Sequence, residues 1–298
     1  MGRHPLFFPY LALISVCFFW GTTYLGIRIA LEGFPPLVLI SGRFLIAGSI
    51  MLLIAWWKKS QFPQGRQLLL TSLYGIMILG VANGCLTFAE QWVPSSLAAL
   101  MLTTSPLVFV SIEHFSGGER IGGRTLLGLL VGLCGAVLLV LPREGSGGMN
   151  QSIWKGFAIL CFGTLCWNSG SILQRRQRLT THPLISGAIQ NFASGMVFLP
   201  LALFVPQHPI IWKLDSTLAA IYLIFFGSIV GFSSYIYALE RLPISVLSMY
   251  NYVNPAVAAV LGVWFYNEPI GWREIAAMLV IFSGVAIVRS AHTVTKSS

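Results

Sequence analysis

The stretch SMYNYVNPAV, Ser248 to Val257, places two asparagines, two tyrosines and a proline inside an apolar run that extends from Ser245 to Phe265. It is matched 149 residues earlier by ALMLTTSPLV, Ala99 to Val108, in which Pro106 is equivalent to Pro255. A proline inside a helix removes one backbone hydrogen bond and bends the helix. Membrane helices tolerate such breaks where side chains or cavity water satisfy the freed groups. The pair therefore predicts two broken membrane helices beside a polar interior, with Pro106 and Pro255 as hinges.

The likeness between the two stretches extends over most of the chain. Further matches at the 149-residue offset include Pro94 with Pro243, Glu119 with Glu268, Arg124 with Arg273 and Gly135 with Gly284, and at an offset of 147 they include Trp20 with Trp167, Arg28 with Arg175, Pro36 with Pro183 and Gly48 with Gly195. These matches predict two copies of one unit, over residues 9–141 and 152–290. Duplication in a structural scaffold, without transport, is the alternative.

Composition predicts an all-α integral membrane protein. Of its 298 residues 56% are hydrophobic and 9% are charged, whereas soluble domains carry about 25% charge. A helix needs about 20 apolar residues to cross a bilayer. Ten such runs are expected, at 9–31, 37–57, 68–90, 95–115, 122–141, 152–173, 184–205, 215–239, 245–266 and 271–290.

Ten helices give five to each copy. Because five is odd, the second copy enters the membrane from the opposite face, as in many transporters with inverted repeats around a central cavity. Twelve basic residues gather on the side of the N-terminus and five on the other, which predicts that both termini are cytoplasmic. The net charge of +9 then reflects topology, and binding to nucleic acid is not expected. The expected partners are the lipid bilayer and a small molecule. The oligomeric state stays open, with a monomer as one option.

Polar side chains in the spans are the candidates for a binding site. In the ninth run Ser248, Asn251 and Pro255 recur at a spacing of three to four residues, which places them on one side of a helix, with Asn254 close by. Asparagines can instead tie helices together, at about 0.6 kcal/mol for each hydrogen bond.

Arg43 is the basic residue placed well inside a span. Its insertion costs about 2.5–3.5 kcal/mol, so it is expected to face a cavity or a partner. No carboxylate is available at its depth, which leaves backbone carbonyls or a substrate carboxylate, although the side chain could also extend to the interface. Its equivalent in the second copy is Gln190. The complete predicted set of substrate-binding residues is Trp20, Tyr24, Arg43, Tyr74, Asn83, Thr103, Trp167, Asn168, Gln190, Asn191, Tyr235, Ser248, Tyr250, Asn251 and Asn254.

The sequence contains no motif for an energy source that would drive transport. It lacks the G-x-x-x-x-G-K-[ST] pattern that binds nucleotide phosphates, and its cysteines lack zinc-ligand spacing, so neither a cofactor nor a metal is expected. The acids and histidines lie in loops or near the ends of spans, whereas a proton relay needs them at depth. Facilitated movement or exchange is therefore favoured over proton coupling, and no catalytic residue is expected.

The chain also resembles a known family. FFWGTTYLGI from Phe18, SGRFLIAGSI from Ser41 and YNYVNPAVAAVLGVWFYNEPIGWREIAAMLV from Tyr250 are similar to the EamA halves of the drug/metabolite transporter superfamily. The resemblance implies a ten-helix exporter of the bacterial inner membrane, and its length and aromatic content are similar to YddG-like exporters of aromatic amino acids. It also implies that Trp20, Tyr24, Arg43 and Trp167 line the cavity. Asn168 departs from the family pattern, because it replaces the glycine of the second Trp-Gly pair.

Export of aromatic or other neutral amino acids by alternating access is therefore the predicted function. An exchanger of phosphorylated metabolites or nucleotide-type compounds is the alternative, but it would be expected to need several basic residues in the cavity. A cation exporter would need a buried glutamate in the first run, which carries Ser15 and Cys17 instead. A membrane-embedded enzyme would need a nucleophile and a base, or metal ligands, at depth.

Overall fold

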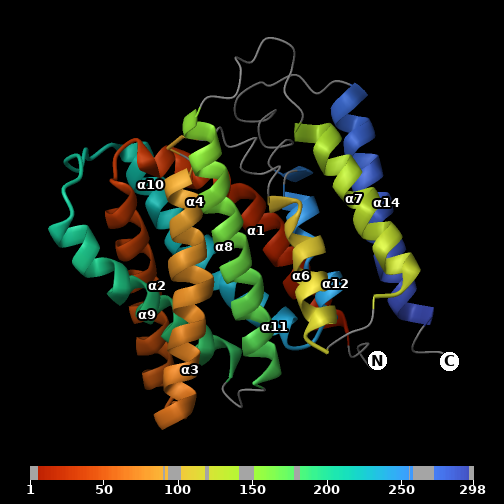
Figure 1. Ribbon diagram of the computed structural model, residues 1–298. Coiled ribbons are helices and arrows are strands. Elements are labelled where there is room, and N and C mark those ends of the chain that lie inside the picture. Colours follow the sequence, from red (N-terminus) through yellow and green to blue (C-terminus); the bar gives the residue numbers. More distant parts are fainter. Residues whose placement is uncertain are drawn as a thin grey trace.

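The structure is a computed structural model that describes residues 6–89, 91–92, 102–117, 121–140, 151–177, 182–254, 256–257 and 272–294. Its described elements are α1 (Phe7–Leu31), α2 (Pro36–Trp57), α3 (Gly65–Gly75), η1 (Ile76–Ala82), α4 (Asn83–Ala89), α6 (Ser105–Phe115), α7 (Gly123–Val140), α8 (Gln151–Arg176), α9 (Pro183–Phe204), α10 (Leu214–Tyr222), η2 (Leu223–Gly231), α11 (Phe232–Leu239), α12 (Ile244–Leu247) and α14 (Trp272–Val294). All of these elements are helical, which confirms the predicted all-α class (Figure 1).

Six of the ten predicted spans are helices that are long and apolar enough to cross a membrane. They are Phe7–Leu31, Pro36–Trp57, Gly65–Ala89, Trp154–Arg176, Pro183–Phe204 and Leu214–Leu239. The predicted spans 122–141 and 271–290 contain shorter apolar helices, Gly123–Gly135 and Ile275–Val288. The predicted spans 95–115 and 245–266 lie partly outside the described residues, so the count of ten stays a prediction.

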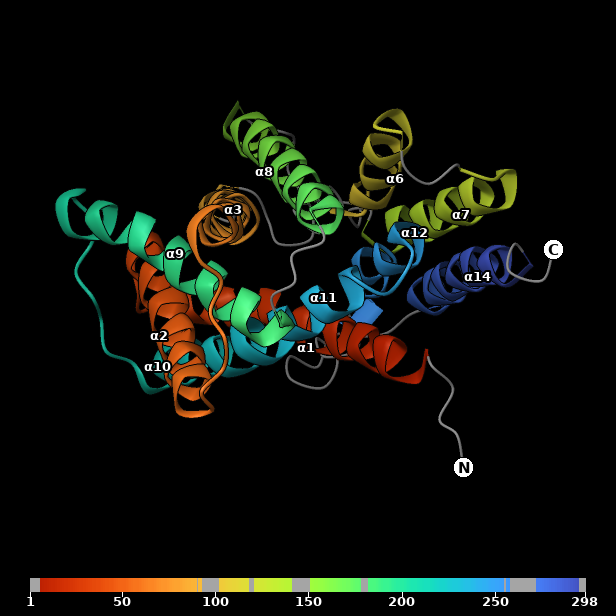
Figure 2. The ribbon, with the colours of Figure 1, turned by 90° about the horizontal axis from the view of Figure 1, so that it is seen from below.

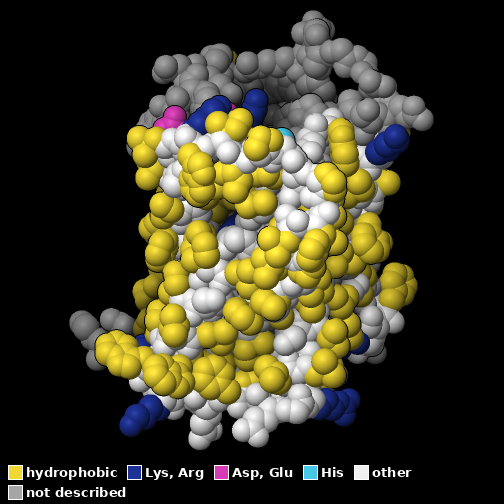
Figure 3. Space-filling view, turned by 90° about the vertical axis from the view of Figure 1, so that its left-hand side faces the viewer, with side chains coloured by type: hydrophobic (Ala, Val, Ile, Leu, Met, Phe, Trp, Pro, Cys, Tyr) yellow, Lys and Arg dark blue, Asp and Glu magenta, His cyan; other side chains and the backbone are white. Residues whose placement is uncertain are grey.

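The outer surface is that of a protein in a bilayer. A broad band of exposed hydrophobic side chains separates two ends that carry Lys and Arg (Figure 3). Trp57 and Trp212 are strongly exposed next to helix termini, where indole rings suit the membrane–water interface. The surface therefore agrees with the composition.

Two helical segments depart from α geometry at equivalent places in the chain. The π-helix η1 starts at Ile76 and η2 starts at Leu223, which is 147 residues later. The Ser194 hydroxyl donates to the carbonyl of Gly75, immediately before η1, over 2.8 Å. Side-chain donors from neighbouring helices can satisfy backbone groups that an irregular helix leaves open. The sequence patterns did not predict either π-helix.

The contact between α2 and α9 is reciprocal. A Cβ atom on Gly195 would lie 2.5 Å from the backbone nitrogen of Leu45, and one on Gly48 would lie 2.7 Å from the Cα of Phe192. Leu45 and Phe192 are 147 residues apart, as are Gly48 and Gly195. The same contact therefore occurs twice with the two halves exchanged. Such an exchange favours the predicted inverted repeat, which stays a prediction.

The helices α7 and α14 pair in the same reciprocal way (Figure 2). A Cβ atom on Gly135 would lie 2.7 Å from the nitrogen of Ile281, and one on Gly284 would lie 2.5 Å from the nitrogen of Gly132. Small residues let helix backbones approach closely in membranes, where apolar burial alone gives little drive for association. The sequence shows a face of small residues in each helix, with Gly128 and Gly132 in α7 and Ser283 and Gly284 in α14.

Replacing Gly284 by leucine is expected to destabilise this pair by about 1–3 kcal/mol, because the new side chain meets backbone atoms of α7 that cannot move aside. Thermal unfolding in detergent, followed by tryptophan fluorescence, measures the effect as a lower melting temperature. Gly123→Leu is the matched control, since nothing lies within 4 Å of a Cβ atom there. Equal melting temperatures for the two variants would contradict the packing argument.

Pro106, the predicted hinge, lies at the start of a helix and not in the middle of a kinked one. A turn at Thr103 and Thr104 precedes α6, and Pro106 stands in the first turn of that helix. A first-turn proline costs no hydrogen bond, because the N–H that it lacks would have no partner in the helix. In the second half the helix is interrupted by a turn at Ser248 and Met249, and Pro255 lies outside the described residues.

Candidate functional site

A cavity lies between α1, η1, α4 and α8, with the segment around Asn251 on its remaining side. It offers about 90 Å³ to water, and the whole hollow with its mouth measures about 750 Å³. Its lining residues on α1 lie in the half of that helix farther from the N-terminus, and those on α8 lie in the middle of the helix.

Eight of the predicted residues line this cavity. They are Trp20, Tyr24, Arg43, Asn83, Trp167, Tyr250, Asn251 and Asn254. The other seven are not part of its lining: Tyr74, Thr103, Asn168, Gln190, Asn191, Tyr235 and Ser248. All seven are buried. The structure thus brings together about half of the predicted set.

Arg43 projects from α2 to the cavity and is 9% exposed. Its Nε donates to the Ser228 hydroxyl of η2 over 2.8 Å. Among the described residues, no carboxylate lies within 4 Å of the guanidinium, and neither terminal nitrogen has a hydrogen-bond partner. Both nitrogens keep some exposed surface, because neither is one of the fully buried side-chain atoms that lack a hydrogen-bond partner. They are available to a solute in the cavity.

Two glycines of η2 make room for the side chains that meet there. A Cβ atom on Gly227 would lie 2.6 Å from Nη2 of Arg43, and one on Gly231 would lie 2.6 Å from Nε1 of Trp20. The Trp20 indole donates to the Gly227 carbonyl over 3.1 Å. Close approach to a backbone is a common reason for glycine. These two positions therefore fix where Arg43 and Trp20 can lie.

Four aromatic side chains, those of Trp20, Trp167, Tyr235 and Tyr250, pack against one another at the cavity. The ring of Trp20 lies 5.3 Å from Trp167, 5.1 Å from Tyr235 and 5.3 Å from Tyr250, between centroids. The Tyr235 hydroxyl accepts from Nε1 of Trp167 over 3.1 Å and bonds the Ser171 hydroxyl over 2.6 Å. We call these four residues the aromatic floor. Within the floor, Trp20, Trp167 and Tyr250 line the cavity, and Tyr235 packs against these three rings without lining it.

The two asparagines at the end of the broken ninth segment have different partners. Asn251 donates to the carbonyl of Ser248 over 3.2 Å. The Asn254 amide, turned so that its nitrogen meets acceptors, donates to the carbonyls of Tyr250 and Cys17 over 3.0 Å each. Asn254 thus ties this segment to α1 as well as lining the cavity. Its position is compatible with both predicted roles, that of a residue that ties helices together and that of a substrate-binding residue.

Two other predicted polar residues, Asn168 and Gln190, bind side chains outside the predicted set. Asn168 and Ser105 join α8 to α6, with the Ser105 hydroxyl donating to Oδ1 over 3.1 Å and the Asn168 amide donating to the Ser105 carbonyl over 3.3 Å. Gln190 donates to Gln174 over 3.0 Å and to Ser186 over 3.1 Å. These contacts are ties between helices and within α9.

The remaining residues of the predicted set have local bonds or lie in the core. Asn191 donates to the carbonyl of Gly187 over 2.8 Å, and the Ser248 hydroxyl donates to that of Ser245 over 3.1 Å. Tyr74 packs in the main hydrophobic core, and Thr103 is fully buried. Residues that the sequence reasoning missed include Thr23, Thr164, Gly227 and Ser228. Thr164 and Ser228 are polar positions inside spans, so the depth criterion could have found them.

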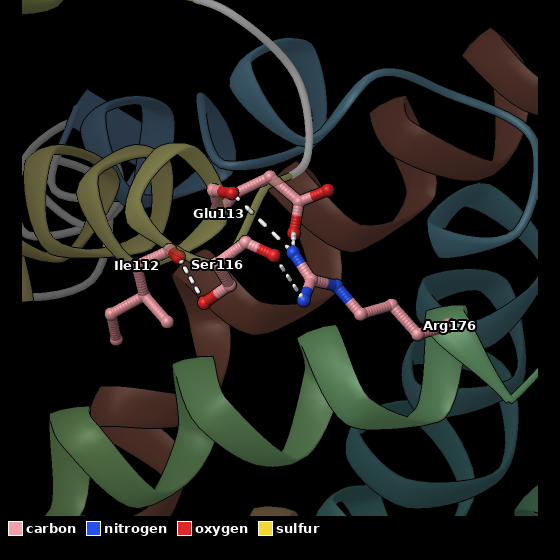
Figure 4. A network of polar contacts seen from close by, with 4 residues as sticks. All are labelled: Ile112, Glu113, Ser116 and Arg176. Carbon is pink, nitrogen blue, oxygen red and sulfur yellow. Dashed lines mark hydrogen bonds and ion pairs between the residues drawn. The ribbon is translucent and has the colours of Figure 1, made fainter.

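A second tie joins α6 to α8 on the side of the N-terminus (Figure 4). Arg176 donates to Oε2 of Glu113 over 3.2 Å and to the carbonyl of Ser116 over 2.8 Å. Glu113 is buried, although Arg176 is more than one third exposed at its side chain. The pair holds the C-terminal ends of α6 and α8 together. Within the described part of the chain, no group of three His, Cys, Asp or Glu side chains could hold a metal ion.

One family model and several known proteins match most of this chain. The model of the EamA-like transporter family matches the chain twice, at residues 7–141 and 154–290. The uncharacterized inner membrane transporter YedA of Escherichia coli K12 is 33% identical over 281 residues, which cover 93% of this chain and 89% of YedA. Protein PecM of Dickeya dadantii is 24% identical over 273 residues, covering 91% of this chain and 88% of PecM.

A solved crystal structure has the same fold. It superposes with a TM-score of 0.80 at 21% sequence identity, and the match covers 94% of this chain and 95% of the other. At this identity the likeness concerns the fold alone.

Proposed function

Because this chain belongs to the EamA-like transporter family and is a multi-pass membrane transporter, we propose that it moves aromatic or other neutral amino acids across the bacterial inner membrane. One observation carries the proposal: Arg43 offers two unpaired guanidinium nitrogens to a cavity whose end is an aromatic floor. A guanidinium pairs with a carboxylate through two parallel hydrogen bonds. An aromatic side chain or other apolar group would pack against Trp20, Trp167 and Tyr250.

The proposed mechanism is alternating access by two inverted five-helix halves. The reciprocal contacts of α2 with α9 and of α7 with α14 support it, because exchanging the conformations of two equivalent halves would open the opposite side. In this mechanism the aromatic floor and the Glu113–Arg176 pair would be the contacts that close the side of the N-terminus. We propose that this side is the cytoplasm, on the basis of its excess of basic residues.

Buried polar atoms behind the floor support a second, wetted state of the same path. Oε1 of Gln190, Oδ1 of Asn191 and Nε2 of Gln174 are buried without a hydrogen-bond partner among the described residues. Buried polar atoms are usually paired with protein or water. Opening the floor would give these atoms water or solute as partners, and it would extend the path to the side that is now closed.

The main test measures flux with purified protein in liposomes. Labelled phenylalanine and tryptophan are expected to equilibrate across the membrane without ATP and without an imposed pH gradient, since the described lining holds no acid or histidine for a proton relay. Protein-free liposomes are the control. Flux that appears only with a proton gradient would contradict facilitated movement, and no flux of any amino acid would contradict the proposed substrate class.

An exchanger of phosphorylated metabolites or nucleotide-type compounds is the second candidate. Its substrates carry several negative charges, which would call for several basic residues, whereas Arg43 is the one charged residue among the described lining residues. The names of the relatives indicate a transporter and not an enzyme. Unlabelled sugar phosphates in the same flux experiment test this candidate directly, because they would compete only if they bind.

A further inference from the structure

We infer that the cavity selects its solutes by a carboxylate and not by an ammonium group, so that aromatic monocarboxylates without an amino group are ligands in their own right. This rests on the proposed function, because it concerns the same cavity. It goes further in naming organic anions as a substrate class, and in placing cationic amines outside it.

The charge of the lining is the first argument. Nineteen residues line the cavity, and among them Arg43 is charged while none is an acid. Described acids lie elsewhere: Glu113 is paired with Arg176, Glu32 with Lys213 and Glu240 with Arg241, and Asp215 stands in the first turn of α10. The described part of the cavity therefore carries one positive charge without a compensating negative one. In a site of low dielectric this favours an anion and opposes a cation.

The arrangement of donors is the second argument. The Nε of Arg43 already donates to the Ser228 hydroxyl, and the Gly227 carbonyl already accepts from the Trp20 indole. The two terminal nitrogens remain, and they form the side of the guanidinium that can bind both oxygens of a carboxylate. Nη2 lies close to the backbone of Gly227, since a Cβ atom there would come within 2.6 Å of it, and both residues line the cavity.

The acceptors available to an ammonium group are the third argument. They are neutral amide oxygens, for instance those of Asn83 and Asn251, and aromatic faces of the floor. A carboxylate at the guanidinium gains both hydrogen bonds and the attraction of an opposite charge, whereas an ammonium group at these neutral acceptors gains hydrogen bonds without an opposite charge. A zwitterion can bind because its carboxylate neutralises Arg43. Its ammonium group then adds little, so removing that group costs little affinity.

A series of matched ligands tests this with the wild-type protein alone. Titration calorimetry of purified protein at neutral pH compares phenylalanine, phenylpropionate, which lacks the amino group, and phenethylamine, which lacks the carboxylate. Phenylpropionate is expected to bind at least as tightly as phenylalanine, and phenethylamine at least about tenfold more weakly than either. Phenethylamine that binds as tightly as phenylpropionate would overturn the inference, as would the absence of binding by phenylpropionate.

Charge variants link the selectivity to Arg43. Arg43→Gln introduces the residue that the chain has at the equivalent position, Gln190, and is expected to remove the preference for phenylpropionate over phenethylamine. Arg43→Lys keeps the charge and is expected to keep the order of the ligands with weaker binding. Arg28→Gln is the control, since Arg28 is exposed and lies outside the lining. An unchanged order of ligands in Arg43→Gln would overturn the assignment to this side chain.

The two proposals fail in different ways. Phenylpropionate binding without amino-acid flux would contradict the proposed function and leave the anion selectivity standing. Amino-acid flux without phenylpropionate binding would do the opposite, because the ammonium group would then be required.

Discussion

Replacing Arg43 by alanine is expected to lower amino-acid flux about 10- to 100-fold in proteoliposomes. The estimate follows from the loss of charge-assisted hydrogen bonds to the substrate carboxylate, worth about 1.5–3 kcal/mol. The variant is expected to fold, because the arginine contributes a single hydrogen bond to the described residues and its charge is costly to hold in the membrane. Flux of labelled phenylalanine measures the effect, with melting temperature as the measure of folding.

Two further variants separate the charge from its surroundings. Ser228→Ala removes the hydroxyl that accepts from Nε but leaves the charge, so a smaller loss of flux is expected. Arg28→Ala changes an exposed arginine of α1 and is expected to leave flux unchanged. Normal flux in Arg43→Ala, with normal folding, would remove this residue from the binding site.

Replacing Gly227 by valine is expected to reduce flux at least about tenfold without changing either the charge or the hydrogen-bonding groups of the cavity. A Cβ atom at this position meets Nη2 of Arg43 at 2.6 Å and Cγ2 of Thr23 at 3.0 Å. The arginine side chain is flexible and can move away, so the cost in stability is small. The cost in function is large, because the guanidinium is pushed into the space that the substrate carboxylate would occupy.

Gly42→Val is the matched control for this variant. Gly42 precedes Arg43 in α2, and nothing lies within 4 Å of a Cβ atom there. The prediction requires Gly227→Val to lose flux and to keep a melting temperature close to that of Gly42→Val. A melting temperature that falls with the flux would show that Gly227 serves packing and not the position of Arg43.

Properties that depend on composition and on spacing along the chain could be predicted from sequence. The bilayer selects long apolar runs wherever they pack, so six spans appear with bounds within a few residues of those expected. The same reasoning placed Arg43 at the cavity, since a charge at that depth needs water or a partner. The small-residue faces of α7 and α14 were visible for a similar reason, because only small side chains permit such close contact.

Other parts of the site depend on contacts between distant segments. Asn168 and Gln190 are amide residues inside predicted spans, as Asn251 is, yet they bind Ser105, Gln174 and Ser186 and do not line the cavity. A polar side chain in a membrane must find a partner, and sequence does not say whether that partner is another helix or a solute. The rotation of each helix about its axis decides this.

By itself, the sequence determined that this protein is a helical membrane transporter of the EamA-like family, because hydropathy and family motifs are properties of the chain alone. Tertiary structure decided which polar residues form the cavity and which seal it. The π-helices η1 and η2 change the rotation of the residues that follow them, and Gly227 and Gly231 admit Arg43 and Trp20 from helices far away in sequence. A binding site is made where side chains from several helices meet, and that meeting is fixed only when the helices pack.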